Sequence, residues 1–171
     1  MRNLTLYRAL TDGTYLTNSS PATDYLSNYS SPDPDFTSCI FLEKGHIMEY
    51  VQAGARKVVS LFFGPEEYVI PCHPLFSSLR SLDPVTTITF THRNIFRTLR
   101  QFPESSAQYQ GIRKQYQEKV DERLRVQQMM SVQERFDYLQ ERQPWVFALV
   151  SRPDIASYLG ITLDELRQLS K

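Results

Sequence analysis

The last twenty residues of the chain, 152–171, predict two short helices joined by a tight turn. Ser151 can cap the first helix, and Pro153 is tolerated in its first turn, where backbone N–H groups have no helical partner. Gly160 stands where the chain must reverse, and glycine adopts a left-handed backbone there without steric penalty. Thr162 can cap the second helix. This arrangement is typical of proteins that place the second helix in the DNA major groove, and it also occurs in ordinary helical hairpins.

The composition is that of a folded chain with no dominant charge. Hydrophobic residues make up 41% of the 171 positions, which is enough for a sizeable core. Nineteen Lys and Arg balance nineteen Asp and Glu, and this balance argues against binding governed by non-specific neutralisation of phosphates. Cys39 and Cys72 are too few for a disulfide framework or a four-cysteine metal site. No apolar run reaches the roughly 18 residues that span a bilayer, and no signal peptide is evident, so we expect a cytoplasmic protein without a membrane partner.

The first half of the chain carries the pattern of a small β domain. The first thirty-six residues are weakly patterned, and a loop is expected over 18–35. The stretch 71–84, with three prolines, is expected to be irregular. Short antiparallel strands at the observed spacing predict a sandwich or a barrel. The runs rich in β-branched and aromatic residues are 38–43, 46–51, 58–63, 68–70 and 86–91.

Helical periodicity begins near Asn94, which can cap a short helix that ends before Pro103. Residues 104–130 contain no proline and predict one long helix of about 40 Å. Ser131 and Glu134 form a capping box for the next helix. The apolar residues of the long helix form a narrow stripe that fits one seam, either onto the β domain or onto a second copy. That stripe consists of Tyr109, Ile112, Tyr116, Val120 and Leu124.

Together these features resemble the Crp/Fnr family of bacterial transcriptional regulators, in particular members common in Bacteroidetes. The resemblance implies an α+β fold in which an N-terminal double-stranded β-helix or jelly-roll barrel, similar to cyclic-nucleotide-binding domains, occupies 1–103. A long dimerisation helix (104–130) and a C-terminal helix-turn-helix domain (131–171) follow. It also implies a homodimer on a palindromic operator in double-stranded DNA, controlled by an unidentified small-molecule effector. The resembling segments are FLEKGHIMEYV (41–51), VVSLFFGPEEYVIP (58–71), FRTLRQFPE (96–104), SVQERFDYLQERQP (131–144) and DIASYLGIT (154–162).

The resemblance also assigns roles to individual residues. In the family, the first turn and the outward face of the terminal helix contact base edges and phosphates, and the start of the preceding helix lies near the phosphates. The dimer seam corresponds to the apolar stripe of the long helix. The implied DNA-binding residues are Arg152, Thr162, Leu163, Asp164, Arg167, Gln168 and Lys171.

Departures from the family pattern weaken the expected DNA binding. Gln168 stands where many relatives carry an arginine that reads guanine, although glutamine can pair with adenine and Asp164 can accept from cytosine. Asp164 and Glu165 place negative charge in the first turn, where it repels phosphate. An alternative function is therefore a ligand-binding or protein-interaction module whose helix-turn-helix no longer binds DNA. Residues 104–171 hold ten basic and ten acidic side chains, of which Arg123, Arg125 and Arg142 are expected on solvated faces.

The β domain lacks the expected signature of a cyclic-nucleotide site. Relatives that bind cyclic nucleotides hold the phosphate with an arginine–serine pair that follows a Gly-Glu turn, because a guanidinium matches a phosphate bidentately. Here the turn is Gly64 to Glu67, and Ser77 stands about where the arginine should fall. Arg80 comes three residues later. We therefore expect that cyclic AMP does not bind.

Metal, redox and enzymatic functions find little support in the sequence. Family members that hold an iron–sulfur cluster use cysteines near the N-terminus, and none precedes Cys39. The residues His46, Cys72, His73 and His92 are scattered over strands and loops rather than spaced as metal ligands. No nucleophile elbow and no Gly-rich phosphate loop occurs. We expect neither a metal nor a cofactor, and we do not expect an enzyme.

Overall fold

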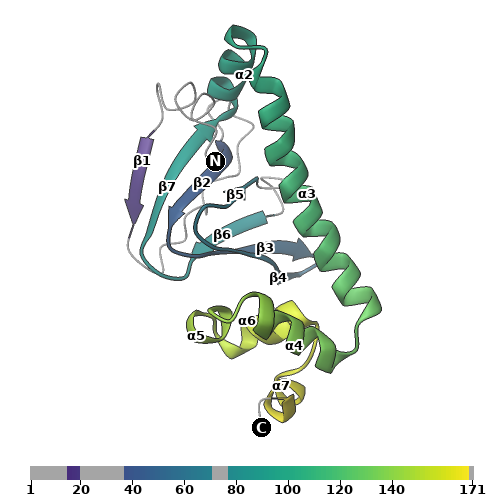
Figure 1. Ribbon diagram of the computed structural model, residues 1–171. Helices are drawn as coiled ribbons and strands as arrows, with labels where there is room; N and C mark the ends of the chain where they lie inside the picture. Colours follow the sequence, from purple (N-terminus) through teal and green to yellow (C-terminus); the bar gives the residue numbers. More distant parts are fainter. Residues whose placement is uncertain (1–14, 20–36, 71–76, 170–171) are drawn as a thin grey trace.

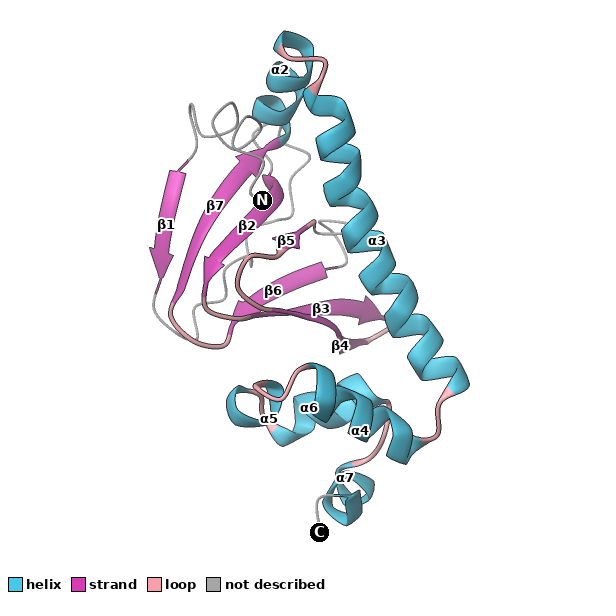
Figure 2. Ribbon diagram, in the orientation of Figure 1, coloured by secondary structure: helices cyan, strands magenta, loops and turns pink. Residues whose placement is uncertain are grey.

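The computed structural model describes residues 15–19, 37–70 and 77–169, and within them strands precede helices (Figures 1 and 2). The strands are β1 (Tyr15–Ser19), β2 (Thr37–Lys44), β3 (Ile47–Ala53), β4 (Arg56–Phe63), β5 (Tyr68–Val69), β6 (Ser77–Ser81) and β7 (Val85–Thr91). The helices are α2 (His92–Gln101), α3 (Ser105–Met129), α4 (Val132–Arg142), α5 (Val146–Leu149), α6 (Arg152–Leu159) and α7 (Leu163–Leu169). This order confirms the predicted α+β class.

The strands form two antiparallel sheets that make up the β domain. One sheet has the order β1-β7-β2-β5, and the other has the order β4-β3-β6. The chain passes from the first sheet to the second through Gly45, which has a φ of +84°. A Cβ at this position would lie 2.5 Å from the carbonyl oxygen of Pro84. Glycine is required here because both the left-handed backbone and the close approach exclude a side chain.

Strand β6 lies within the stretch that was predicted to be irregular, so that prediction is wrong over Ser77–Ser81. Its sequence, SSLRS, contains no β-branched or aromatic residue, and such residues are the usual signal of a strand. This segment forms a strand because it pairs with β3: Val51 to Ile47 run antiparallel to Ser77 to Ser81. Leu79, 2% exposed, fills the core from this strand. Residues 71–76 lie outside the described part of the chain.

The long helix α3 closes the space between the two sheets. Its Tyr116 stacks on Phe63 of β4 with 6.1 Å between ring centroids, and Lys119 lies 4.7 Å from the centroid of the same Phe63 ring. Val120 packs against the same core. All members of the apolar stripe except Leu124 therefore pack onto the β domain, which is one of the two predicted uses of the stripe. The buried strand residues of this core are Ile40, Leu42, Ile47, Leu61, Phe63, Val69, Leu79 and Val85.

Helix α2 begins before the predicted cap. Its N-cap is Thr91, whose hydroxyl accepts a hydrogen bond from the backbone N–H of Asn94 at 3.2 Å, so the prediction of Asn94 as the cap is wrong. Thr91 ends strand β7 in an extended conformation (φ −77°, ψ 157°), the backbone geometry that an N-cap adopts. Ile95, one turn later, is buried against β2 and β7.

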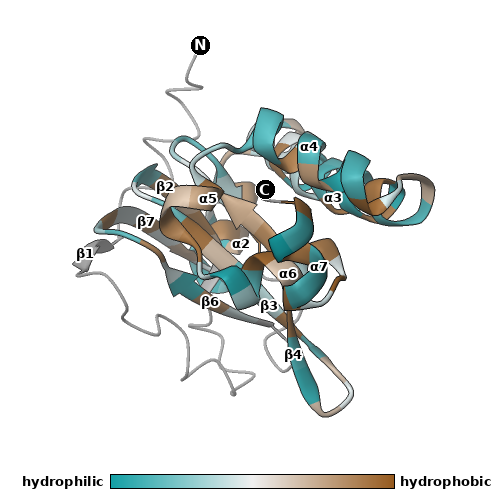
Figure 3. Ribbon diagram, turned by 90° about the horizontal axis from the view of Figure 1, so that it is seen from below, coloured by the Kyte–Doolittle hydropathy of each residue, from teal (hydrophilic) through white to brown (hydrophobic). Residues whose placement is uncertain are grey.

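Residues 131–169 form a helical unit that packs on the outer face of the β4-β3-β6 sheet (Figure 1). Seen from below, these helices lie across the β domain, and the hairpin of β3 and β4 projects beyond them (Figure 3). The predicted capping box of Ser131 and Glu134 is confirmed at the start of α4. The shared core joins Met48, Val59 and Phe62 of the sheet to Phe136, Leu139, Val146, Val150, Ile155, Ala156, Leu159 and Leu166.

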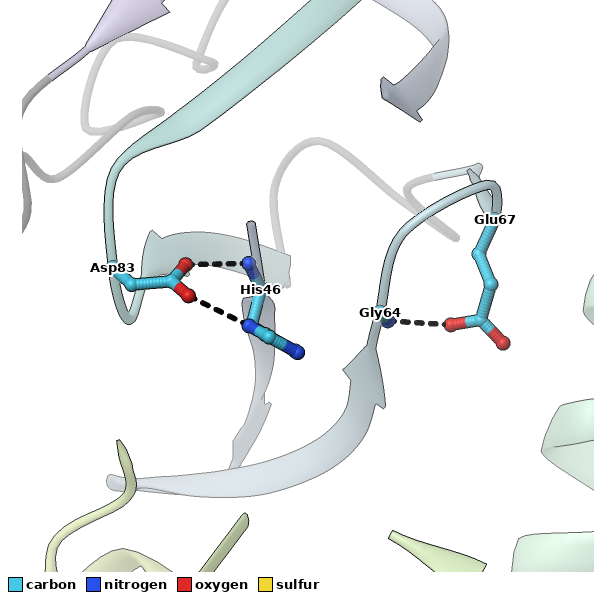
Figure 4. Close-up of polar contacts among 4 residues, drawn as sticks. All are labelled: His46, Gly64, Glu67 and Asp83. Atoms are coloured by element: carbon cyan, nitrogen blue, oxygen red, sulfur yellow. Dashed lines mark hydrogen bonds and ion pairs between the residues drawn. The ribbon is translucent and has the colours of Figure 1, made fainter. Parts of the chain in front are cut away.

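Trp145, the only tryptophan of the chain, lies where the helical unit meets the β domain. The centroid of its ring lies 4.2 Å from the ring centroid of His46 and 6.0 Å from the ring centroid of Phe62. Asp83 fixes His46 by accepting from its backbone N–H at 2.6 Å and lying 2.7 Å from its ring Nδ1 (Figure 4). His46 is thus a structural hydrogen-bonding residue, and Trp145 packs, partly buried, in the junction.

Candidate nucleic-acid interface

The turn between α6 and α7 has the local geometry that the sequence predicts. The Ser151 hydroxyl accepts from the N–H of Asp154 at the start of α6, and Gly160 ends that helix with a φ of +68°. Thr162 and Glu165 then exchange two hydrogen bonds, of 2.8 Å from the Thr162 N–H and 3.3 Å from the Glu165 N–H. The predicted caps and the left-handed glycine are confirmed, so the direction of α7 is fixed by local hydrogen bonds.

The residues predicted to contact DNA lie on the solvent side of this helix pair. Leu166 is only 3% exposed and packs into the shared core, so the opposite side of α7 faces outward. Lys171 lies outside the described residues. The exposed members of the predicted set are Arg152, Thr162, Leu163, Asp164, Arg167 and Gln168.

The charged side chains of α7 are Asp164, Glu165 and Arg167, so this helix carries one net negative charge. Arg167 donates to the Asp164 carboxylate at 2.7 Å, an exposed pair one helical turn apart. Hydrogen bonds from the backbone and the hydroxyl of Thr162 lower the pKa of Glu165, which therefore stays ionised at neutral pH. A phosphate or a guanine would have to draw Arg167 away from Asp164. The surface therefore offers little general attraction for phosphates.

The stripe predicted for a dimer seam divides between two environments. Ile112 and Tyr116 are buried in the β domain of the same subunit, and Tyr109 and Val120 pack at the edge of its core. Leu124 is 49% exposed and points to neither sheet core. Leu124 is thus the member of the stripe that remains accessible.

The turn at Gly64 to Glu67 is occupied by protein contacts. The Gly64 N–H donates to the Glu67 carboxylate at 2.7 Å (Figure 4). The Lys119 ammonium of α3 donates to both oxygens of the same carboxylate at 2.7 Å. Arg80 is exposed and stands opposite Met48, a residue of the outer sheet face, so it does not point into the β domain. The side chain of Ser77 lies outside the described part.

Glu49 of β3 is a candidate functional residue that sequence reasoning did not single out. It is 1% exposed, and the hydroxyl of Tyr116 donates to both of its carboxylate oxygens at 3.2 Å. Burial raises the pKa of Glu49 to about 7, against the opposing effect of hydrogen bonds from Tyr116 and Ser60. The only sequence signal is an acidic residue inside the strand IMEYV, at a position whose alternation points inward.

Arg123 of α3 is a second residue that the sequence misplaced. It was expected on a solvated face, yet it is 8% exposed because it packs on the ring of Tyr158 at 3.8 Å. Its guanidinium also donates to the backbone carbonyl of Tyr158. No sequence pattern predicts this contact, because the two residues belong to different helices and lie 35 positions apart in the chain.

In the described ranges, no three His, Cys, Asp or Glu side chains gather as a metal site would require. Cys72 and His73 fall outside those ranges. No helix among the described residues combines the length and apolar character of a membrane span.

Comparisons with known proteins reveal similarity in structure rather than in sequence. No protein-family model matches the chain, and no curated protein matches it. A Crp/Fnr-family transcriptional regulator from Eubacterium rectale is 8% identical with a TM-score of 0.74, over 98% of this chain and 81% of that one. The c-di-GMP-responsive global regulator CLP from Xanthomonas campestris is 14% identical with a TM-score of 0.70, over 98% and 89%. FixK2 from Bradyrhizobium japonicum is 15% identical with a TM-score of 0.67, over 91% and 83%.

These similarities extend over nearly the whole chain, from the sheets through α3 to the terminal helices. At 8–15% identity they establish architecture and leave ligands and partners to be argued from the residues. The predicted likeness to members from Bacteroidetes stays a prediction. The chain has the fold shared by regulators of the Crp/Fnr type.

Proposed function

We propose that this protein is a DNA-binding transcriptional regulator of the Crp/Fnr type that acts as a homodimer. Residues 1–103 would form an effector domain, 104–130 a connecting and dimerisation helix, and 131–171 a helix-turn-helix domain. The observation that carries the proposal is the orientation of α7. Leu166 fixes its inner side in the core, while the residues that would read DNA stand together on the outer side.

Three exposed residues of α7 each suit a particular contact. Gln168 can pair bidentately with adenine, and Arg167 can bind guanine or a phosphate once it leaves Asp164. Asp164 can accept from the amino group of cytosine, and each well-aligned contact contributes about 1–3 kcal/mol of discrimination. Arg152 begins α6, where the free N–H groups of a helix start also favour a phosphate.

Dimerisation would pair two copies along the face of α3 that the β domain leaves open. Leu124 lies on that face, and a twofold axis beside it would present two α7 helices to one side of the duplex. A symmetric dimer reads half-sites about 34 Å apart, one turn of DNA. Sedimentation velocity on the full chain, compared with Leu124→Glu, tests this: the charged variant should be monomeric, and an unchanged dimer would place the interface elsewhere.

The effector of this regulator is unidentified and is not cyclic AMP. The carboxylate of Glu67 is engaged by Lys119, and Tyr116 and Phe63 fill the space between the sheets and α3. Arg80, the nearest candidate for the missing arginine, lies on the outer face. Calorimetry with cyclic AMP should record no heat of binding, and micromolar affinity would contradict this part of the proposal.

Selection of random duplex DNA with the purified chain tests DNA binding directly. A palindromic motif with half-sites one turn apart is expected. Arg167→Ala and Gln168→Ala should each then weaken binding to that motif by about 5- to 150-fold, the equivalent of one lost base contact. Gln140→Ala, an exposed glutamine on α4, is the matched control. Unchanged affinity in both α7 variants would remove this helix from the interface.

A second function, a protein-interaction or ligand-binding module, is favoured by one observation. Arg167 is paired with Asp164, and Glu165 adds a negative charge in the same turn. Such a surface would repel phosphate if no base contacts compensated for it. The same selection separates the two functions, since a module of this kind would enrich no motif and would not retard duplex DNA even at low salt.

A further inference from the structure

The C-terminal end of α6 is held by arginines from two other helices. Arg123 of α3 donates to the carbonyl oxygen of Tyr158, in the last turn of α6. Arg135 of α4 lies beside Gly160, where an added Cβ would be 3.5 Å from its Nη1 atom. The last carbonyls of a helix lack intrahelical partners and carry the negative end of its dipole, so cations are favoured at this position.

Arg123 is costly to place here, which indicates that its contact with Tyr158 is specific. Burial, together with the smaller effect of the nearby Arg135, lowers the pKa of Arg123 to about 10, against an opposing effect of Tyr158. Taking a guanidinium out of water is unfavourable unless other groups replace the lost hydration. The carbonyl oxygen of Tyr158 and the face of its ring, 3.8 Å from the guanidinium carbon, supply that replacement.

Tyr158 connects three parts of the molecule. One side of its ring meets Phe62 of β4, with 4.6 Å between centroids, and Arg123 of α3 lies over the ring as well. The residue itself belongs to α6 and stands two positions before Gly160, the residue that turns the chain into α7. The β domain, the long helix and the helix-turn-helix therefore meet at this one side chain.

The junction borders open space on one side, while Ile155, Ala156 and Leu159 pack α6 against the sheet on the other. A cleft of about 530 Å³ opens beside it, lined by residues of α3, α4 and α6 that include Arg123, Val126, Tyr138 and Tyr158. The contact between Arg123 and Tyr158 links α3 to α6 at the edge of this open space. A tilt of α6 at this end would carry the Gly160 turn and α7 with it.

We propose that Arg123 is a positioning residue for α7: it fixes the end of α6 against α3 and thereby sets the orientation in which α7 meets DNA. The inference rests on the proposed function, and Arg123 itself touches no nucleic acid. The planar, forked guanidinium is required, because it stacks on a ring and donates to a carbonyl at the same time, which a lysine ammonium does not do.

The test compares Arg123→Lys and Arg123→Ala with Arg125→Lys and Arg125→Ala, which change an exposed arginine two positions along the same helix. With a palindromic duplex from the selection, both Arg123 variants should bind about 2- to 30-fold more weakly, as expected for a residue that couples two elements. The dependence of affinity on salt should stay that of the native protein, because no phosphate contact is lost. Arg125→Lys should bind like the native chain.

Hydrogen exchange on the free protein gives a readout that needs no DNA. In both Arg123 variants, amides of residues 158–166 should exchange faster, while those of β2 and β7 keep their protection. Unchanged affinity, or a salt dependence reduced by about one phosphate contact, would overturn the proposal. If the native chain binds no DNA, the proposed function fails, and exchange still decides the positioning role: unchanged protection over 158–166 refutes it.

Discussion

The buried carboxyl group of Glu49 predicts an unusual dependence of stability on pH. Its pKa rises from 4.5 to about 7 on folding, because burial disfavours the charged form. Between these two values the folded chain holds a proton that the unfolded chain has released. The free energy of unfolding therefore falls as pH rises from about 4.5 to about 7, by about 3 kcal/mol from this group alone. Most carboxylates in proteins act in the opposite direction.

Glu49→Gln isolates this contribution, because glutamine has nearly the same shape and still offers an oxygen to the Tyr116 hydroxyl. The variant should gain about 3 kcal/mol over the native chain near pH 8 but only about 1 kcal/mol near pH 5.5. Any pH-independent effect of the new amide group changes the stability of the variant equally at the two pH values. The informative quantity is therefore the difference between the two pH values, about 2 kcal/mol.

Urea unfolding followed by Trp145 fluorescence measures this difference, since the only tryptophan lies between the β domain and the helical unit. Glu118→Gln, which neutralises an exposed carboxylate on α3, serves as control and should run parallel to the native chain. Tyr116→Phe removes the donor that favours ionised Glu49, so the loss of stability should extend to higher pH. Native and Glu49→Gln curves that run parallel between pH 5.5 and 8 would refute the reasoning.

Two further predictions concern single positions. Gly45→Ala should lower the free energy of unfolding by about 2 kcal/mol or more, because the added Cβ would lie 2.5 Å from the Pro84 carbonyl oxygen. Gly54→Ala has open space around it and should lower the free energy of unfolding by only about 1 kcal/mol, the cost of its left-handed backbone. Equal losses of stability in thermal unfolding would show that the contact with Pro84 is unimportant. Leu166→Ala should lose about 2–5 kcal/mol because Leu166 is 3% exposed, and retention of native stability would mean that α7 is not anchored in the core.

The sequence by itself determined the features that depend on neighbouring residues. The capping box of Ser131, the caps of α6 and α7, the left-handed Gly160 and the break before Pro103 all rest on interactions within about four positions. Such signals are readable because the side chain and the backbone group it serves lie in the same short segment. The long helix and most strands were predictable for the same reason, from the spacing of their apolar residues.

The tertiary structure alone decided which residues distant in the chain meet. The sequence SSLRS became strand β6 because the edge of β3 was free to pair with it. Glu49 is buried against Tyr116, which is 67 positions away in the chain. Arg123 packs on Tyr158 and is buried, although its sequence context predicts a solvated position. Periodicity places a side chain on a face, but the partner of that face is chosen by how the sheets, α3 and the helical unit pack. Burial and pKa depend on that partner, so the groups that govern stability and couple the domains emerged only in the folded chain.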